Sequence, residues 1–255
     1  MRLNVIEMGQ GTPLVLLHGL FGQAGNFGAV QKVLAGNGRR VLALDLRNHG
    51  ASPHAAEMDY ATMAADVAET LQALGAAPAD VVGHSMGGKV AMMLALAHPG
   101  VVSRLVVVDI APVAYPPAFR PYAEAMQALP LEPGLTRKTA DAALAAAVPA
   151  AGVRGFLLQN LDLARPAWRI GLGEIAAALP GIEAAPELPA GKRFDGPVLV
   201  LSGENSDYVR EEHRPAFRAL FPAVRFGRVK GAGHWVHAEQ PARFLAALGA
   251  FLGEG

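Results

Sequence analysis

The sequence predicts an α/β protein with a mainly parallel, twisted sheet covered by helices on both faces. Short apolar runs rich in valine and leucine alternate along the chain with longer helical patterns. Such alternation indicates strand–helix–strand units, in which neighbouring strands run parallel. The runs carry few polar residues, which is typical of strands buried on both faces. The six runs are PLVLLHG (13–19), RVLALDL (40–46), DVVGHS (80–85), RLVVVDI (104–110), PVLVLSG (197–203) and VRFGRVKG (224–231).

Helical patterns separate most of these runs. The segments are amphipathic or rich in alanine, as expected of helices that connect or follow parallel strands. They are GNFGAVQKVLAG, YATMAADVAETLQALG, MGGKVAMMLALAHP, REEHRPAFRALFP and QPARFLAALGAFL.

Residues 111–193 interrupt the alternation, because they contain no convincing strand and are rich in alanine and proline. Helical patches are expected at 120–129, 136–148, 153–165 and 171–179. The alternation resumes at Pro197. We therefore expect a core domain formed by residues 1–110 and 194–255, with residues 111–193 inserted as a helical cap over the edge of the sheet. The alternative is that these helices only add packing to the core.

The composition is that of a globular protein without an anionic partner. Of its 255 residues 52% are hydrophobic and 17% charged, which suits one large α/β domain rather than a disordered chain. The 22 basic and 22 acidic residues balance, so nothing favours nucleic acid or an anionic membrane as partner. The absence of cysteine excludes disulfides and thiolate metal ligands. No apolar stretch approaches 18 residues and no signal-peptide pattern is present, so we expect a cytoplasmic monomer or small homo-oligomer without a membrane span.

A serine stands between glycines at one junction of a strand and a helix. Residues 83–87 read Gly-His-Ser-Met-Gly and fit the pattern G-x-S-x-G. A strand that ends at Gly83 must turn sharply into a helix that starts near Met86, which strains the backbone of Ser85 and lifts its hydroxyl away from the chain. The helix N-terminus also favours negative charge beside that hydroxyl. We therefore predict that Ser85 is a nucleophile, the alternative being a serine that only forms the turn.

A serine hydroxyl needs a base to act as a nucleophile, and His234 is the predicted base. It lies in GAGHWVHAEQP, between the last strand and the last helix, where loops gather at the carboxyl edge of a parallel sheet. The order serine, acid, histidine of this motif class also places the base there. His237 is the rival, although its place at the start of the final helix favours a structural role. His18, His49 and His84 occupy glycine turns at other strand ends, where we expect them to line the site or support loops.

Two aspartates are candidates for the carboxylate that orients the histidine. In many enzymes with such a serine the acid follows the strand at 197–203, where this chain reads GENSDYV. Asp207 lies there, one residue late for the usual G-x-x-D spacing, and Ser206 takes the expected place. Asp109 ends the apolar run VVVDIAP, and a buried carboxylate needs a partner such as a histidine. We therefore favour Asp109 and keep Asp207 as the alternative.

An oxyanion hole should complete the site. The backbone N–H of Met86, the residue after the nucleophile, is one expected donor. The second should come from the loop LLHGLFGQ, where Leu20 is the expected donor and Phe21 a residue that lines the acyl pocket. The alternative for this loop is a plain glycine turn. Further pocket candidates are Met86 itself and four aromatic residues of the expected cap, Phe119, Tyr122, Phe156 and Trp168.

Five motifs in this order resemble those of the α/β-hydrolase superfamily over essentially the whole chain. They are HGLFG, LDLRNHG, GHSMGGK, VDIAP and AGHWVHAEQP. Within the superfamily they are similar to the bacterial YbfF-type esterases and their relatives, the mammalian abhydrolase-domain serine hydrolases. The resemblance implies the α/β-hydrolase fold with a helical cap after strand six, and the short N-terminus implies that the first strand of the eight-stranded form is missing or abbreviated. It also implies Ser85 as nucleophile, His234 as base and Asp109 as acid, although Asp207 departs from that group.

The predicted function is that of a serine carboxylesterase. The resemblance implies that it cleaves short-to-medium acyl esters or acyl thioesters, including acyl-CoA, through a Ser-His-Asp triad and an acyl-enzyme intermediate. Such chemistry requires no metal and no organic cofactor. The same triad also serves lyases, C–C hydrolases and cofactor-free haloperoxidases, and a ligand sensor with slow turnover is a further alternative.

Overall fold

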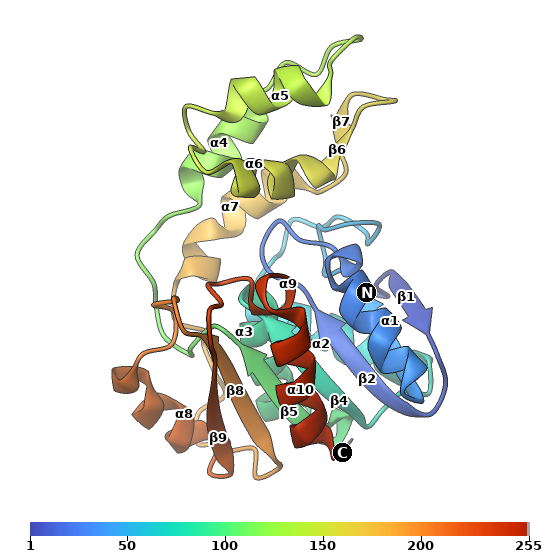
Figure 1. The fold of residues 1–255 in the computed structure, drawn as a ribbon, viewed down its shortest axis with the longest axis vertical. Coiled ribbons are helices and arrows are strands. Elements are labelled where there is room, and N and C mark those ends of the chain that lie inside the picture. The colour runs from blue at the N-terminus through green and yellow to red at the C-terminus, as the bar shows by residue number, and fades with distance from the viewer. Residues whose placement is uncertain (254–255) are drawn as a thin grey trace.

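A single seven-stranded sheet organises the computed structural model, which describes residues 1–253 (Figure 1). The strands follow the order β1-β3-β2-β4-β5-β8-β9 across the sheet. Only β1 is antiparallel to its neighbour, so the predicted mainly parallel α/β sheet is confirmed. The strands are β1 (Val5–Met8), β2 (Thr12–Leu17), β3 (Arg39–Leu44), β4 (Ala79–His84), β5 (Val102–Val108), β8 (Val198–Gly203) and β9 (Val224–Val229).

The register brings the carboxyl ends of the central strands to one edge of the sheet. Leu17 at the end of β2 pairs with Gly83 of β4, and Gly83 pairs with Val107 of β5. Val108 pairs in turn with Leu201 of β8. The strand order also reverses here, because β3 lies on one side of β2 and β4 on the other. Ligands bind at such a reversal, beyond the carboxyl ends of the strands.

Helices cover both faces of the sheet. On one face α1 (Gly28–Gly36) and α10 (Pro241–Leu252) pack through residues such as Leu34 and Phe244. The other face is covered by α2 (Tyr60–Ala73), α3 (Met86–Ala97) and α8 (Arg214–Leu220). Helix α3 begins directly after Ser85 and is buried from Met86 to Leu96, so its N-terminus is held firmly by the core. No helix formed by residues 1–253 combines the length and hydropathy needed to cross a membrane.

Four helices and a small sheet lie between β5 and β8. The helices are α4 (Arg120–Gln127), α5 (Arg137–Leu144), α6 (Ala151–Leu157) and α7 (Leu172–Glu183), and the sheet pairs β6 (Leu161–Asp162) with β7 (Ala167–Trp168). Figure 1 shows this segment above the carboxyl edge of the large sheet. The segment follows the fifth strand of the observed sheet. The expected position after strand six uses the strand numbers of the eight-stranded form, which has one strand more than the observed sheet.

The small sheet corrects the sequence-based expectation of one helix over 153–165 and no strand in this segment. Helix α6 ends at Leu157, and the chain then forms the β6–β7 hairpin. Within the hairpin, Oδ1 of Asp162 accepts hydrogen bonds from the amides of Ala164 and Arg165. Such a local turn competes with helical hydrogen bonding, and Pro166 follows it directly.

A buried ion cluster joins the opposite, amino-terminal edge of the sheet. Asp80 at the start of β4 accepts two hydrogen bonds of 2.8 Å from Arg104 of β5 and another from Arg39 of β3. The Asp80 side chain is only 2% exposed. A carboxylate removed from water in this way is stable only while its cationic partners remain. The ion cluster thus lies at the amino-terminal edge of the sheet, and the expected ligand site lies at the carboxyl edge.

Replacement of Asp80 by alanine should therefore destabilise the fold without altering the residues at the carboxyl edge of the sheet. The Asp80→Ala variant should lose about 3–5 kcal/mol of unfolding free energy in urea denaturation, because the arginines would be left without their buried counter-charge. The control is Glu7→Gln, which removes the exposed Arg40–Glu7 pair and should change stability by less than about 1 kcal/mol. Equal losses in the two variants would contradict the stabilising role assigned to the ion cluster.

Candidate active site

Ser85 occupies a strained corner between β4 and α3. Its φ of 52° and ψ of −122° lie in a region that residues with side chains rarely adopt. The corner requires glycine on both sides. A Cβ atom on Gly83 would lie 2.2 Å from the Gly87 carbonyl oxygen, and one on Gly87 would lie 2.4 Å from that of Leu17. The G-x-S-x-G pattern therefore reflects the close approach of strand and helix.

His234 brings an imidazole to this serine from the far end of the chain. It lies between β9 and the short helix α9 (Val236–Glu239). Its Nε2 atom is 3.1 Å from Oγ of Ser85, and its Nδ1 atom is 2.7 Å from Oδ2 of Asp109. Because the buried carboxylate can only accept while ionised, Nδ1 carries the proton and Nε2 is free to accept one from the serine.

Asp109 is fully buried at the turn that follows β5, where its φ is 51°. Besides His234, its carboxylate accepts hydrogen bonds from the Gly203 amide at 3.0 Å and from the Ser206 hydroxyl at 2.5 Å. Asp207 is exposed, and the only hydrogen bond involving it in the described part of the chain is one that its backbone carbonyl accepts from Arg210. The structure therefore brings Asp109 together with Ser85 and His234 and leaves Asp207 at the surface.

Three groups around His234 were not assigned from the sequence. Ser206 stands at the usual acid position and donates to Asp109 instead. The Tyr208 ring stacks on the His234 imidazole with centroids 4.1 Å apart and planes inclined by 24°. The Glu239 carboxylate accepts hydrogen bonds from the amides of Gly233 and Trp235, on either side of His234. The acidic residue in the AGHWVHAEQP motif was a usable signal, since Glu239 ends the single turn of α9 and a carboxylate within the first turn of a helix is favoured by the amides that precede it.

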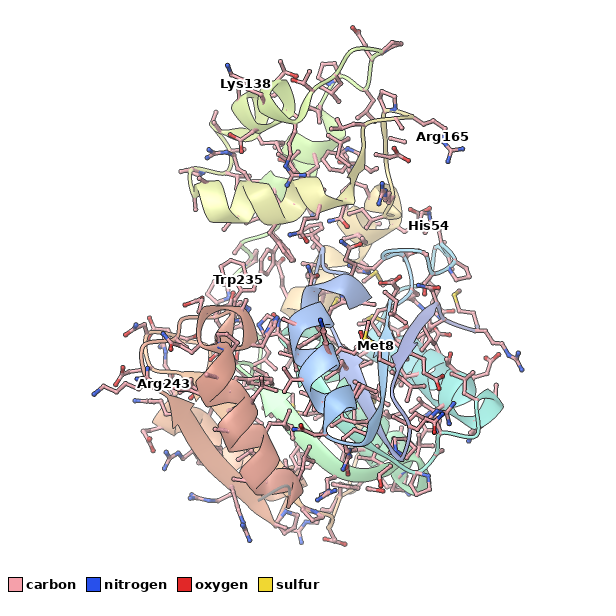
Figure 2. The ribbon with its side chains drawn as sticks, turned by 45° about the vertical axis from the view of Figure 1, so that its right-hand side comes forward. Met8, His54, Lys138, Arg165, Trp235 and Arg243 are labelled. Atoms are coloured by element: carbon pink, nitrogen blue, oxygen red, sulfur yellow. The ribbon has the colours of Figure 1, made fainter. Side chains whose placement is uncertain are left out.

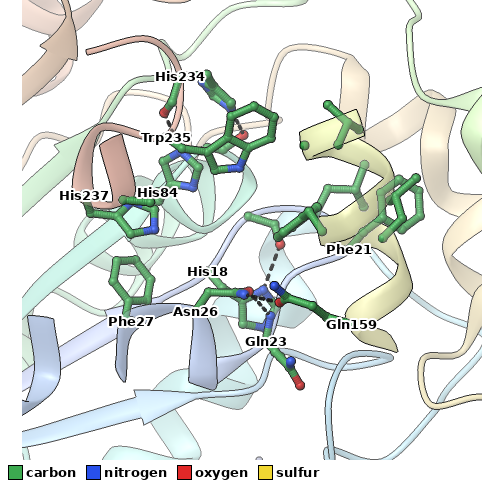
Figure 3. Close-up of a pocket in the computed structure, with 18 of the residues that line it drawn as sticks. His18, Phe21, Gln23, Asn26, Phe27, His84, Gln159, His234, Trp235 and His237 are labelled. Carbon is green, nitrogen blue, oxygen red and sulfur yellow. Dashed lines mark hydrogen bonds between the residues drawn. The ribbon is translucent and has the colours of Figure 1, made fainter. Parts of the chain in front are cut away.

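The remaining site histidines are structural in their contacts. His237 packs against Phe27 with ring centroids 4.5 Å apart, and burial lowers its pKa to about 4. His84 is placed to donate from Nε2 to the His234 carbonyl oxygen at 2.9 Å, and burial lowers the pKa of His84 well below its usual value. Figure 3 shows His84, His237 and Phe27 side by side along one wall of the site. His234 alone among them bonds to the serine hydroxyl.

The expected oxyanion donors keep their N–H groups free. Within residues 1–253, neither the Leu20 amide nor the Met86 amide donates a hydrogen bond to another group of the protein. Both residues are almost fully buried, and Leu20 lines the same cavity as Ser85. Buried backbone donors without partners are rare, so two beside one hydroxyl indicate a place for an acceptor that arrives with a ligand.

A cavity of about 730 Å³ opens over Ser85 and His234 (Figure 3). Phe21 lines it, as expected, and the segment between β5 and β8 supplies much of the opposite wall. The residues from that segment are Phe119, Tyr122, Gly152, Val153, Phe156, Leu157 and Gln159. Trp168 lies outside this lining and donates from Nε1 to the Met126 carbonyl oxygen, so its expected role in the pocket is wrong. The side chain of Met86 is likewise not part of the lining.

The cavity is mostly apolar and carries little charge. No lysine or arginine lines it in the described part of the chain, and Glu239 is its only acidic residue. Figure 2 shows Trp235 beside the cavity, between the sheet layers and the segment above, whereas the cationic Lys138 and Arg165 lie on the outer side of that segment. Such a cavity suits an uncharged ligand with an apolar portion.

Comparison with known proteins agrees with this geometry. The family model described as alpha/beta hydrolase fold matches residues 12–241. The chain is 43% identical to the sn-1-specific diacylglycerol lipase ABHD11 of Mus musculus, over 94% of this chain and 80% of that protein. It is 37% identical to esterase YbfF of Escherichia coli, over 95% and 94%. A solved structure of a marine microorganism esterase superposes with a TM-score of 0.92 at 32% identity, covering 98% and 99% of the two chains. The resemblance inferred from the motifs is thereby confirmed, and the chain belongs to the α/β-hydrolase family as one of its esterases.

Proposed function

We propose that the enzyme is a serine carboxylesterase that cleaves uncharged esters with short-to-medium acyl chains through an acyl-enzyme intermediate on Ser85. The observation that carries this proposal is the continuous hydrogen-bonded chain from Ser85 through His234 to Asp109, open to a largely apolar cavity. A hydroxyl bonded to a base, and a base bonded to an orienting carboxylate, form the arrangement required for nucleophilic acyl transfer.

In the first half-reaction, Oγ of Ser85 attacks the ester carbonyl carbon while Nε2 of His234 takes the hydroxyl proton. The carbonyl oxygen becomes an anion, which the N–H groups of Leu20 and Met86 bind. Collapse of the intermediate breaks the bond to the alcohol oxygen, which leaves with the proton from His234. Water then attacks the acyl-enzyme with His234 again as base, and the carboxylic acid is released.

Asp109 has the role of the triad acid in this scheme. Its buried carboxylate fixes the tautomer of His234 and stabilises the imidazolium that forms when the serine is deprotonated. The hydrogen bonds from Gly203 and Ser206 hold the carboxylate in its orientation. The Tyr208 ring, stacked on His234, adds a π face beside the same developing cation.

The segment 111–193 serves as the cap of this site, and residues 1–110 and 194–253 serve as the core. The last two residues of the expected core, 254 and 255, lie outside the described residues. The cap role is supported by the seven residues that the segment contributes to the cavity lining. Most of them are apolar or aromatic, so the cap supplies surface for an acyl chain and excludes water from the reacting carbonyl.

The same lining favours oxygen esters over acyl-CoA thioesters. Coenzyme A carries several phosphate charges, and such groups are usually bound by arginine, lysine or helix N-termini. Among residues 1–253 no arginine or lysine lines the cavity, and Glu239 would repel an anion. The names of the relatives agree, since the murine protein is a diacylglycerol lipase and the Escherichia coli protein an esterase.

Loss of the Ser85 hydroxyl should abolish turnover. We expect Ser85→Ala to lower kcat for p-nitrophenyl butyrate by at least about 10⁴-fold, because both the attack and the acyl-enzyme are lost. A fluorophosphonate should label the wild-type protein once, at Ser85, as mass spectrometry of peptides would show. Stoichiometric labelling without steady turnover of any ester tested would favour the ligand sensor instead.

Replacement of Asp109 and replacement of Asp207 should have clearly different effects on kcat. Asp109→Asn should lower kcat by about 10⁴-fold, because an amide beside Nδ1 no longer fixes the productive tautomer. The matched control Asp207→Asn alters an exposed carboxylate and should leave kcat within about twofold of wild type. Both can be measured with p-nitrophenyl butyrate after circular dichroism has verified folding. The reverse pattern would transfer the acid role to Asp207.

The preference for an uncharged leaving group can be tested with two thioesters that share the same acyl chain. We compare kcat/KM for S-butyryl-CoA and for S-butyryl-N-acetylcysteamine, which has the same thioester and lacks the phosphates. The enzyme should prefer the uncharged thioester by at least about tenfold, because the CoA phosphates find no cation in the cavity. Equal values, or a preference for the CoA ester, would overturn the assignment of uncharged substrates and leave the triad untouched.

A further inference from the structure

The loop that carries the Leu20 amide is a tight turn with an unfavourable backbone. The Gly22 amide donates to the Gly19 carbonyl oxygen at 2.9 Å, which closes a four-residue turn. Phe21, the third residue of that turn, has a φ of 59°, a conformation for which glycine is preferred. A large residue keeps such a conformation only if its surroundings hold it there.

Buried side chains hold the first two peptide groups of this turn. Nδ1 of His18 is 2.8 Å from the Gly19 carbonyl oxygen, to which it is placed to donate. Because N–H and C=O point in opposite directions across a trans peptide, this bond directs the Leu20 N–H away from His18. The next amide, that of Phe21, donates to Nε2 of His49 at 3.1 Å. Nδ1 of His49 is 2.9 Å from the Arg47 carbonyl oxygen, to which it is placed to donate, and burial lowers the pKa of His49 to about 3. The imidazole is therefore neutral with its proton on Nδ1, and Nε2 is the acceptor.

The third peptide group is held from the segment above the sheet. Nδ2 of Asn160 donates to the Phe21 carbonyl oxygen at 2.7 Å, across 139 positions of sequence. The same nitrogen is 3.2 Å from the Leu157 carbonyl oxygen, and the two acceptors fix the orientation of the amide. Asn160 is 1% exposed, and its Oδ1 atom is buried without a hydrogen-bond partner. An amide with one unsatisfied end is an unfavourable choice for a core position, which argues that its donor end has a use.

We propose that Asn160 is a positioning residue for the oxyanion hole: it fixes the Phe21 peptide, and through the turn it aims the Leu20 N–H at the oxyanion. The cap then contributes to the chemical step as well as to the cavity wall. This inference rests on the proposed function, because it presupposes that Leu20 binds a developing anion.

The test is the pair Asn160→Ala and Asn160→Leu, of which the second nearly preserves side-chain volume and removes the donor. Both should lower kcat for p-nitrophenyl butyrate by about 10–100-fold, less than the loss of a whole donor, with KM within about threefold. Rates are referred to the concentration of active sites, titrated with a fluorophosphonate, so that unfolded protein does not contribute.

A trifluoromethyl propyl ketone gives a second readout, because Ser85 adds to its carbonyl and generates a bound oxyanion. Its inhibition constant should rise in the Asn160 variants by the same factor by which kcat/KM falls, as expected for an interaction made in the transition state. If Asn160 had a purely structural role, its replacement would lower the melting temperature and leave both kcat/KM and the inhibition constant at their wild-type values.

The matched control is Tyr60→Phe. The Tyr60 hydroxyl donates to the Ile182 carbonyl oxygen at 2.6 Å, another buried side-chain bond between the sheet layers and the segment above. Its loss should lower the melting temperature, with kcat and ketone inhibition as in wild type. Unchanged kcat in the Asn160 variants beside an active wild type overturns the positioning role alone. An inactive, unlabelled wild type overturns the proposed function itself.

Discussion

The close contact of Gly87 with the end of β2 is the constraint on which the rest of the site depends. A Cβ atom at Gly87 would lie 2.4 Å from the carbonyl oxygen of Leu17 and 2.5 Å from that of His18. Helix α3 can therefore begin only where a residue without a side chain meets this backbone. The contact sets Ser85 at its strained corner, and it also brings the turn after His18 beside the same serine. One packing requirement thus places the nucleophile and the loop that faces it.

The sequence was sufficient wherever a signal was local. Strands buried on both faces appear as continuous apolar runs, so the alternation of strands and helices could be predicted. The corner at Ser85 depends on residues within two positions of it, and the chain order of the motif class then pointed to His234. Asp109 could be preferred to Asp207 by a burial argument, because a carboxylate at the end of an apolar run implies a partner. The geometry around the serine is consistent with that preference.

Contacts between distant segments could not be predicted in this way. The bond from Asn160 to Phe21 spans 139 positions, and no local pattern marks either residue for it. The hydrogen bond from Ser206 to Asp109 likewise becomes evident only when the ends of β5 and β8 are adjacent. The β6–β7 hairpin was not predicted, for a different reason. Its alanine- and leucine-rich flanks favour helix, and a single side chain, that of Asp162, diverts the backbone into a turn.

Two of the bonds that attach the segment above the sheet end on elements next to the nucleophile. Asn160 binds the loop after β2, whereas Lys89, one turn into the helix that starts after Ser85, donates to the Ala184 carbonyl oxygen at 2.7 Å beyond the end of α7. Burial lowers the pKa of Lys89 to about 8, and the negative charge of Glu183, the last residue of α7, opposes this shift. A displacement of the segment would therefore act on the loop that supplies the Leu20 donor, whereas Met86 is held by the buried start of α3. Under the proposed positioning role, the segment that lines the cavity also orients a donor of the oxyanion hole, so contacts of the acyl group with this segment would influence kcat as well as KM.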